Sequence, residues 1–254
     1  TIESDSMGWY CYTAIEFVGN HILLGHCAGD RRFTNGLATT HITRLSLDWI
    51  YEENDNCIDL GPVDIDTNYP HPETNPYSEL MLEGSWVPDN PHKIDFNNLP
   101  HISGEHRIIS HVVETGGVNQ HNYLTHFNGL FWAMWSDGPG VEDRVGQRVA
   151  FATSKDGLNW SKPKYITPFP PNSGPDSPVY NTRSKKGYRY ISRGYWKRGK
   201  ELLALVSLDE ADNFFGPDLE LRAFRLDPKN NTWTDIGQVY DNAINNFPPK
   251  LLPN

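Results

Sequence analysis

The chain has 254 residues and a formal net charge of -10 at neutral pH. Nucleic-acid binding depends on clustered Lys and Arg, so this acidic balance excludes a protein that follows a phosphate backbone. The length suits one large domain or two small ones, and 37% hydrophobic residues are more than a disordered chain contains. No apolar stretch is long enough to span a membrane, and no membrane partner is expected.

Strand patterns dominate from the N-terminus onward, as short runs rich in Val, Ile, Phe, Tyr and Trp between polar turns. The first group of strands is expected at 9–18, 21–29 and 41–49. The segment 52–117 is rich in Pro, Asn, Asp and His, which predicts a linker and covering segment. Within it, one strand is expected at 107–113.

Two further groups repeat this order of strand, tight hairpin, strand, longer polar loop and strand. The second has its strands at 119–127, 130–138 and 148–153, and the third at 187–196, 201–209 and within 218–237. Gly19-Asn20 and Asn128-Gly129 suit two-residue hairpins, which require positive φ. A short fourth strand is expected in the last two groups, and 245–254 is expected to begin a further unit.

Four-stranded antiparallel units in series are the blades of a β-propeller. An immunoglobulin-like sandwich is the rival all-β fold, but it does not predict equivalent units with the long loop always in the same place. The expected fold class is therefore an all-β propeller, incomplete in this chain, with about three blades visible.

Three stretches carry a family resemblance. "SKDGLNW" at 154–160 resembles the Asp-box of the sialidase-like (BNR-repeat) propellers, with a spacing one residue tighter between Asp156 and Gly157 than in the commonest form. "LDPKNNTW" at 226–233 is similar to a degenerate copy in the next blade. The opening segment, 7–51, looks like a closing blade of sialidase-family enzymes, with an early tyrosine and "LDW" near its end. The resemblance implies a sialidase-like propeller active on glycans.

The resemblance also bears on domains, partners and location. It implies a closing-type blade at 1–51 and further blades at 118–254, an order that fits two tandem propellers cut at their ends, or one permuted or incomplete propeller. The missing blades would come from adjacent sequence or from another copy. We expect a secreted or periplasmic protein, although no signal peptide is visible. No cofactor is expected, but a structural calcium ion is compatible with the fold.

Two candidate catalytic residues lie early in the first strand of their units. In a propeller blade, the start of the first strand and the loop between the second and third strands lie on the same face of the propeller. The turn that holds Asp156 lies on the opposite face. Superposition of the hairpins predicts that Tyr12 and His121, and less securely Tyr190, lie at equivalent positions near the channel mouth. Aromatic filling of the channel wall is the competing interpretation for each of them.

The resemblance places a catalytic tyrosine at Tyr12, and a neighbouring carboxylate would have to act as its base. Glu114, Glu142 and Asp143 are the candidates for this base. His121 titrates near neutrality and is a candidate general base. A structural histidine is the alternative.

The loop at 135–148 brings acids and cations together, with Asp137, Glu142, Asp143, Arg144 and Arg148. Asp137, Glu142 and Asp143 can divide acid and base roles if their environments separate their pKa values, whereas a solvated glycine-rich turn is the simpler alternative. Candidate substrate contacts are the amides, arginines and tyrosine that would face a sugar or its acidic group: Asn119, Asn122, Arg144, Arg189, Tyr190 and Arg193.

These features predict a carbohydrate-active protein that binds an acidic oligo- or polysaccharide. The leading hypothesis is a glycoside hydrolase of the sialidase superfamily. A polysaccharide lyase that cleaves a uronate-containing polymer by His/Tyr β-elimination is the second. The three arginines that bind the sialic acid carboxylate in sialidases are not identifiable, which disfavours that sugar and strengthens a third hypothesis, a glycan-binding propeller without catalysis.

Overall fold

A computed structural model describes residues 7–30, 32, 37–48, 104–112, 116–212, 219–240 and 250–251. The chain divides into two compact units, and all the strands belong to the one that comprises 7–47 and 104–254. The other comprises 1–6 and 48–103, of which the structure describes only Asp48. Among the described residues, no helix is long and apolar enough to cross a membrane.

The first sheet contains a strand that comes from the predicted linker. Its strands, in order across the sheet, are β1 (Gly8–Val18), β2 (His21–Asp30), β3 (Thr39–Ser46) and β4 (Glu105–His111). The first three agree with the strands expected there. The isolated strand expected at 107–113 is β4, and it pairs antiparallel with β3. The first blade is therefore completed by residues that follow the Pro-rich segment.

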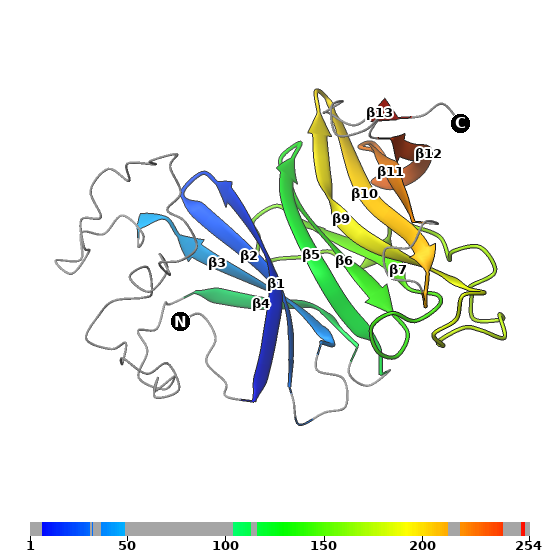
Figure 1. Cartoon of the computed structure of the whole chain (residues 1–254). Coiled ribbons are helices and arrows are strands. Elements are labelled where there is room, and N and C mark those ends of the chain that lie inside the picture. The colour runs from blue at the N-terminus through cyan, green and yellow to red at the C-terminus, as the bar shows by residue number, and fades with distance from the viewer. Residues whose placement is uncertain are drawn as a thin grey trace, which may run out of the picture. The chain divides into compact units, whose positions relative to one another are not determined.

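The second and third sheets follow the predicted order (Figure 1). The second consists of β5 (Val118–Phe127), β6 (Leu130–Gly138), β7 (Arg148–Ser154) and β8 (Lys164–Tyr165). The third consists of β9 (Tyr188–Arg198), β10 (Glu201–Glu210), β11 (Glu220–Asp227), β12 (Thr232–Tyr240) and β13 (Lys250–Leu251). The described part of the expected further unit, β13, pairs with β12 and extends this sheet.

The hairpin predictions are confirmed. Asn128 and Gly129 join β5 to β6 with φ of 49° and 72°, and a type I′ turn requires positive φ at both central positions. Gly19, with φ of 56°, opens the turn between Val18 and His21. These turns set the register of the first two strands in each of the first two sheets.

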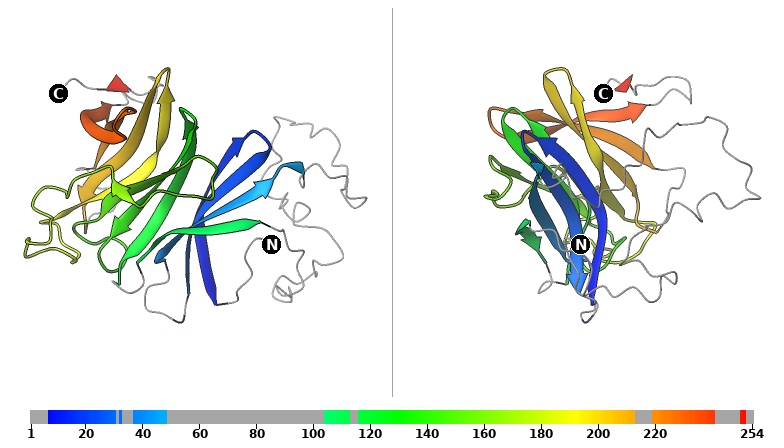
Figure 2. Two further views of the ribbon diagram at one scale, coloured as in Figure 1. Left: turned by 180° about the vertical axis from the view of Figure 1, so that it is seen from behind. Right: turned by 90° about the vertical axis from the view of Figure 1, so that its left-hand side faces the viewer.

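The three sheets pack on one another in series as propeller blades (Figure 2). Alternate residues of β6 point to opposite faces, as in any strand. Trp132 and Met134 enter the core shared with the third sheet, whereas Phe131 and Trp135 enter the core shared with the first. The fold is therefore an all-β stack of propeller blades, and within the described residues the ring of blades is not closed.

The turn between β7 and β8 is built by Asp156. Its Oδ1 accepts hydrogen bonds from the backbone nitrogens of Leu158 and Asn159, at 2.9 and 2.7 Å. Trp160 donates from Nε1 to the oxygen of Gly157 at 2.9 Å and packs against the core between the first two sheets. The acid, the glycine and the tryptophan all have structural partners here.

Asp227 occupies the corresponding place between β11 and β12. Its carboxylate accepts from the nitrogen of Lys229 at 3.0 Å and from Nδ2 of Asn230 at 2.8 Å. Trp233, near the start of β12, packs edge to face against Trp132 with ring centroids 5.7 Å apart. The two turns thus orient successive blades in the same way.

Candidate active site

Tyr12 and His121 lie at matching irregularities of the innermost strands. The pairing register breaks between Cys11 and Ala14 in β1, and between Gln120 and Tyr123 in β5. Tyr12 and His121 have φ of 55° and 53°, a conformation that costs a residue with a side chain about 1–2 kcal/mol. Their ring centroids are 4.5 Å apart. The two residues are equivalent, as predicted, and their rings are in contact.

In the third sheet, the equivalent irregularity contains Arg193. The register of β9 breaks between Ser192 and Gly194, which leaves Arg193 as the extra residue. Tyr190, which was expected at this position, is instead buried and packs edge to face against Phe224. Hairpin counting failed here because β9 continues to Arg198, two residues beyond the predicted end of the strand at 196. A count from the observed turn therefore reaches Ser192, beside the break, and not Tyr190.

His121 is held in its neutral form. Burial lowers its pKa to about 4, and the positive charges of Arg193 and Arg189 act in the same direction. The Nδ1 atom is buried and has no hydrogen-bond partner in the described part of the chain. Ser192 fixes the backbone at this point by donating from Oγ to the His121 oxygen at 2.6 Å. The imidazole is therefore unprotonated at neutral pH and can accept a proton.

Tyr12 is held in its protonated form. Partial burial raises the pKa of its phenol, and the negative charge of Glu142 raises it further. Burial and the neighbouring Asp143 also raise the pKa of Glu142. Within the described residues, no carboxylate accepts a hydrogen bond from Tyr12. The phenol can donate a proton, but no base is positioned to remove one. Glu114 lies outside the described residues.

Asp143 and Arg189 are paired with each other rather than with solvent. Arg189, whose side chain is 2% exposed, forms salt bridges through Nη1 with Asp143 and through Nη2 with Asp209 at 2.8 Å. Arg183 lies 3.7 Å from the other oxygen of Asp143. These contacts leave neither of the predicted residues available to a substrate. Asp209 had no predicted role, yet it lies directly opposite Arg189 in the hairpin register, a signal that the sequence contains.

The two predicted amides are also occupied. Asn119 is fully buried and donates from Nδ2 to Oγ of Ser110 at 2.8 Å. Asn122 is buried between the first two sheets, where Oδ1 accepts from Thr40 at 3.3 Å and Nδ2 donates to Sγ of Cys27 at 3.2 Å. The structure therefore assigns these amides to packing between blades and not to sugar binding.

The remaining three predicted residues lie in three different places. Arg193 donates from Nε to Oγ of Ser207 at 2.9 Å and is close enough to influence the pKa of His121. Arg144 is half-buried in the loop between β6 and β7. Asp137 lines a separate cavity, where Oδ2 accepts from the hydroxyl of Tyr165 at 2.7 Å. The loop's acids thus do not form one cluster.

The described residues contain no group of three or more His, Cys, Asp or Glu side chains that could hold a metal ion. Cys11 and Cys27 are register partners on β1 and β2, and both are free thiols.

No protein-family model matches the chain, and no curated protein is similar to it. Solved structures are similar at low identity. A protein of unknown function from Dyadobacter fermentans DSM 18053 is 10% identical with a TM-score of 0.51, over 95% of this chain and 58% of that one. The likeness is one of fold.

Two further structures are less similar. Trypanosoma rangeli sialidase is 10% identical with a TM-score of 0.49, over 91% of this chain and 32% of its own. An N-acetylgalactosamine deacetylase from F. plautii, in complex with blood group B trisaccharide, is 9% identical with a TM-score of 0.45, over 92% and 54%. The chain thus spans less than two thirds of each of these three structures.

Proposed function

We propose that the chain is part of a carbohydrate-active enzyme that cleaves a uronate-containing polysaccharide by β-elimination, with His121 as the base and Tyr12 as the acid. The observation that carries the proposal is the contact between these two rings, one of which is a neutral imidazole and the other a protonated phenol. Acid–base catalysis requires such a pair in reach of one substrate.

The reaction needs no water and no cofactor. His121 removes the proton at C5 of the uronate, the electron pair forms the C4–C5 double bond, and the C4–O bond breaks. Tyr12 gives its proton to the departing glycosidic oxygen. A cation must neutralise the substrate carboxylate to make the C5 proton acidic, and Arg193, at the equivalent break in β9, is the candidate.

A glycoside hydrolase of the sialidase superfamily is the second candidate, and Glu142 favours it. In that mechanism a carboxylate would activate Tyr12 as a nucleophile, and the negative charge of Glu142 does act on Tyr12. Under either mechanism we propose that the turns at Asp156 and Asp227 are Asp-boxes of the sialidase-like propellers. Their shared place between the third and fourth strands of successive blades supports this assignment. A polymeric substrate also favours a secreted or periplasmic location.

Incubation with a panel of uronate polysaccharides tests the proposal. An elimination produces the ultraviolet absorbance of the unsaturated uronate, whereas a hydrolysis releases reducing ends without that absorbance. His121→Ala and Tyr12→Phe should each lower the elimination rate about 100-fold or more. His126→Ala on the same strand and Tyr10→Phe on β1 are the matched controls and should retain the rate.

Three outcomes would contradict the elimination mechanism. Reducing ends without absorbance would favour the hydrolase. Glycan binding without turnover would favour a binding module. Turnover that survives His121→Ala would exclude the assigned base.

A further inference from the structure

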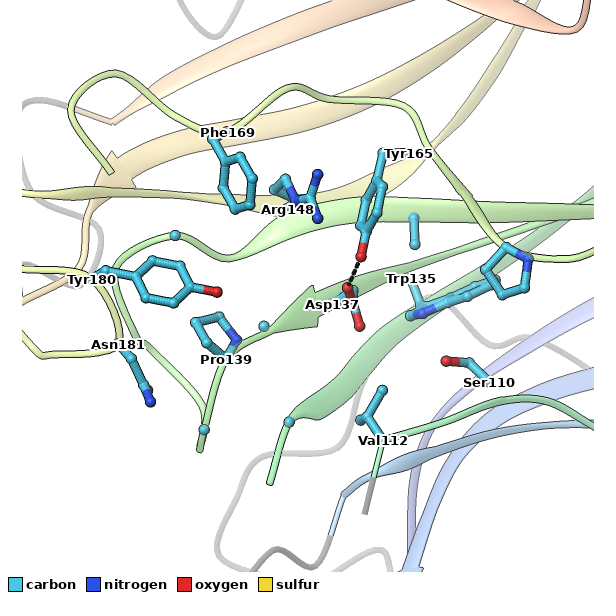
Figure 3. Close-up of a pocket in the computed structure, with 16 residues that line it drawn as sticks. Ser110, Val112, Trp135, Asp137, Pro139, Arg148, Tyr165, Phe169, Tyr180 and Asn181 are labelled. Atoms are coloured by element: carbon cyan, nitrogen blue, oxygen red, sulfur yellow. Dashed lines mark hydrogen bonds between the residues drawn. The ribbon is translucent and has the colours of Figure 1, made fainter. Parts of the chain in front are cut away.

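A cavity of about 500 Å³ lies beside the ends of β4, β6 and β7, and the Tyr12 and His121 pair is not part of its wall. Its chemically distinctive walls are Asp137, Arg148, Tyr165, Phe169, Tyr180 and Asn181 (Figure 3). The volume is in the range of pockets that enclose small ligands. Among these residues, Asp137 was predicted from the sequence to be catalytic, and Arg148 to be a cation of the same loop.

Arg148 is clamped between two aromatic rings. Its guanidinium carbon lies 3.3 Å from the centroid of Tyr165 and 3.9 Å from that of Phe169 (Figure 3). The rings cover both flat faces of the guanidinium, so a ligand can reach its N–H groups only in the plane of the guanidinium. In the part of the chain that the structure describes, no carboxylate forms a salt bridge with Arg148.

Asp137 lies directly opposite Arg148 in the register of β6 and β7. Tyr165 donates to Oδ2 of Asp137, and no described residue donates to Oδ1. Burial raises the pKa of this carboxyl group, while the same hydrogen bond and the charge of Arg148 favour its ionised form. The cavity thus presents an acceptor and a set of in-plane donors side by side.

Two glycines allow Asn181 and Tyr180, on the far wall of the cavity, to pack closely against the backbone of the β6–β7 loop. A Cβ at Gly140 would lie 2.4 Å from Oδ1 of Asn181, and one at Gly146 would lie 2.4 Å from Cε2 of Tyr180. Gly146 also has φ of 96°, which side chains rarely adopt. Any other residue at these positions would displace the ring and the amide from the cavity.

We propose that this cavity binds one pyranose unit of a glycan, as a subsite separate from the Tyr12–His121 pair. Sugar hydroxyls both donate and accept, which matches the free oxygen of Asp137 and the edge of Arg148. Asn181 adds an amide, and the rings of Tyr165, which is 44% exposed, and Tyr180 offer apolar surface to the carbon face of the sugar. That the ligand is a glycan rests on the proposed function.

Calorimetry with trigalacturonate and with α-1,4-linked galactotriose, its neutral counterpart, tests the proposal. The protein carries His121→Ala as a background, so that turnover does not consume the ligand. We expect at least one saccharide to bind, and we expect Arg148→Met and Asn181→Ala each to weaken that binding by about tenfold or more. Asn181 is exposed, so its variant keeps the test informative if Arg148→Met does not fold.

The outcomes separate this proposal from the catalytic one. Failure of both saccharides to bind, or binding that stays within about twofold in both folded variants, would overturn the subsite. Weakened binding in both variants, together with no elimination activity in the wild-type protein, would support the subsite and refute the lyase.

Discussion

Replacing Arg189 by Met should destabilise the protein by about 3–5 kcal/mol, the usual effect of removing one partner from a buried ion pair. The side chains of Arg189 and Asp209 are 2% and 3% exposed, and that of Asp143 is 10% exposed. Met fills much of the volume, but it leaves Asp209 without its cation and Asp143 with only the more distant Arg183, where water cannot replace the guanidinium. Most of the loss should therefore come from the unpaired carboxylates and not from a cavity.

Urea unfolding followed by far-UV circular dichroism measures the change, and Arg198→Met on the same hairpin is the matched control. Arg198 is paired with Glu201 at 2.7 Å, but these side chains are 41% and 36% exposed, so its loss should cost less than about 1 kcal/mol. The difference between the variants should shrink as the pH falls, because protonation removes the unpaired charge from Asp143. Equal destabilisation by the two substitutions at neutral pH would refute the structural role of Arg189.

Three further predictions follow from the pKa shifts and the backbone. The elimination rate should rise through about pH 4 as His121 loses its proton, and should decline only in the alkaline range where Tyr12 ionises; an acidic limb near pH 6.5 would contradict the assignment of His121. Folding lowers the pKa of this histidine, so the unfolded chain binds more protons than the folded one between pH 6.5 and about 4. The free energy of unfolding should therefore decrease as the pH falls through this range, and the decrease should be smaller in His121→Gln than in the wild type. Urea titrations at several pH values measure the difference. Gly157→Ala should lower the melting temperature more than Gly129→Ala. The two glycines have similar positive φ (76° and 72°), but only a Cβ at Gly157 would lie against Leu23, at 2.8 Å. Equal losses would show that the backbone conformation alone matters.

The candidate site was predictable where local pattern determines it. Tyr12 and His121 lie at the same distance before matched two-residue turns, so their equivalence followed from the hairpins alone. Tyr190 was misplaced because the predicted strand ended at 196, whereas β9 pairs with β10 as far as Arg198, which moves the equivalent position two residues along the strand. A break in register depends on how a strand packs against its neighbours.

The roles of the polar residues could not be assigned in the same way. A fully buried arginine and a partly buried one have the same letter in the sequence. What separates Arg189 from Arg193 is the partner that each side chain finds in the folded structure. The same holds for Asp137. Its place on β6 puts it in the wall of the cavity, and Glu142 in the following loop is not part of that wall.

The sequence by itself determined the strands, the hairpin turns and the repeat of blades, because period-two burial and positive-φ turn residues act over a few neighbouring positions. Tertiary structure alone decided that 105–111 completes the first sheet, since its partner β3 lies on the other side of a segment of more than 50 residues. It also decided which charges neutralise one another and which remain for a ligand, because that depends on distances between side chains from different blades and on the water that packing excludes.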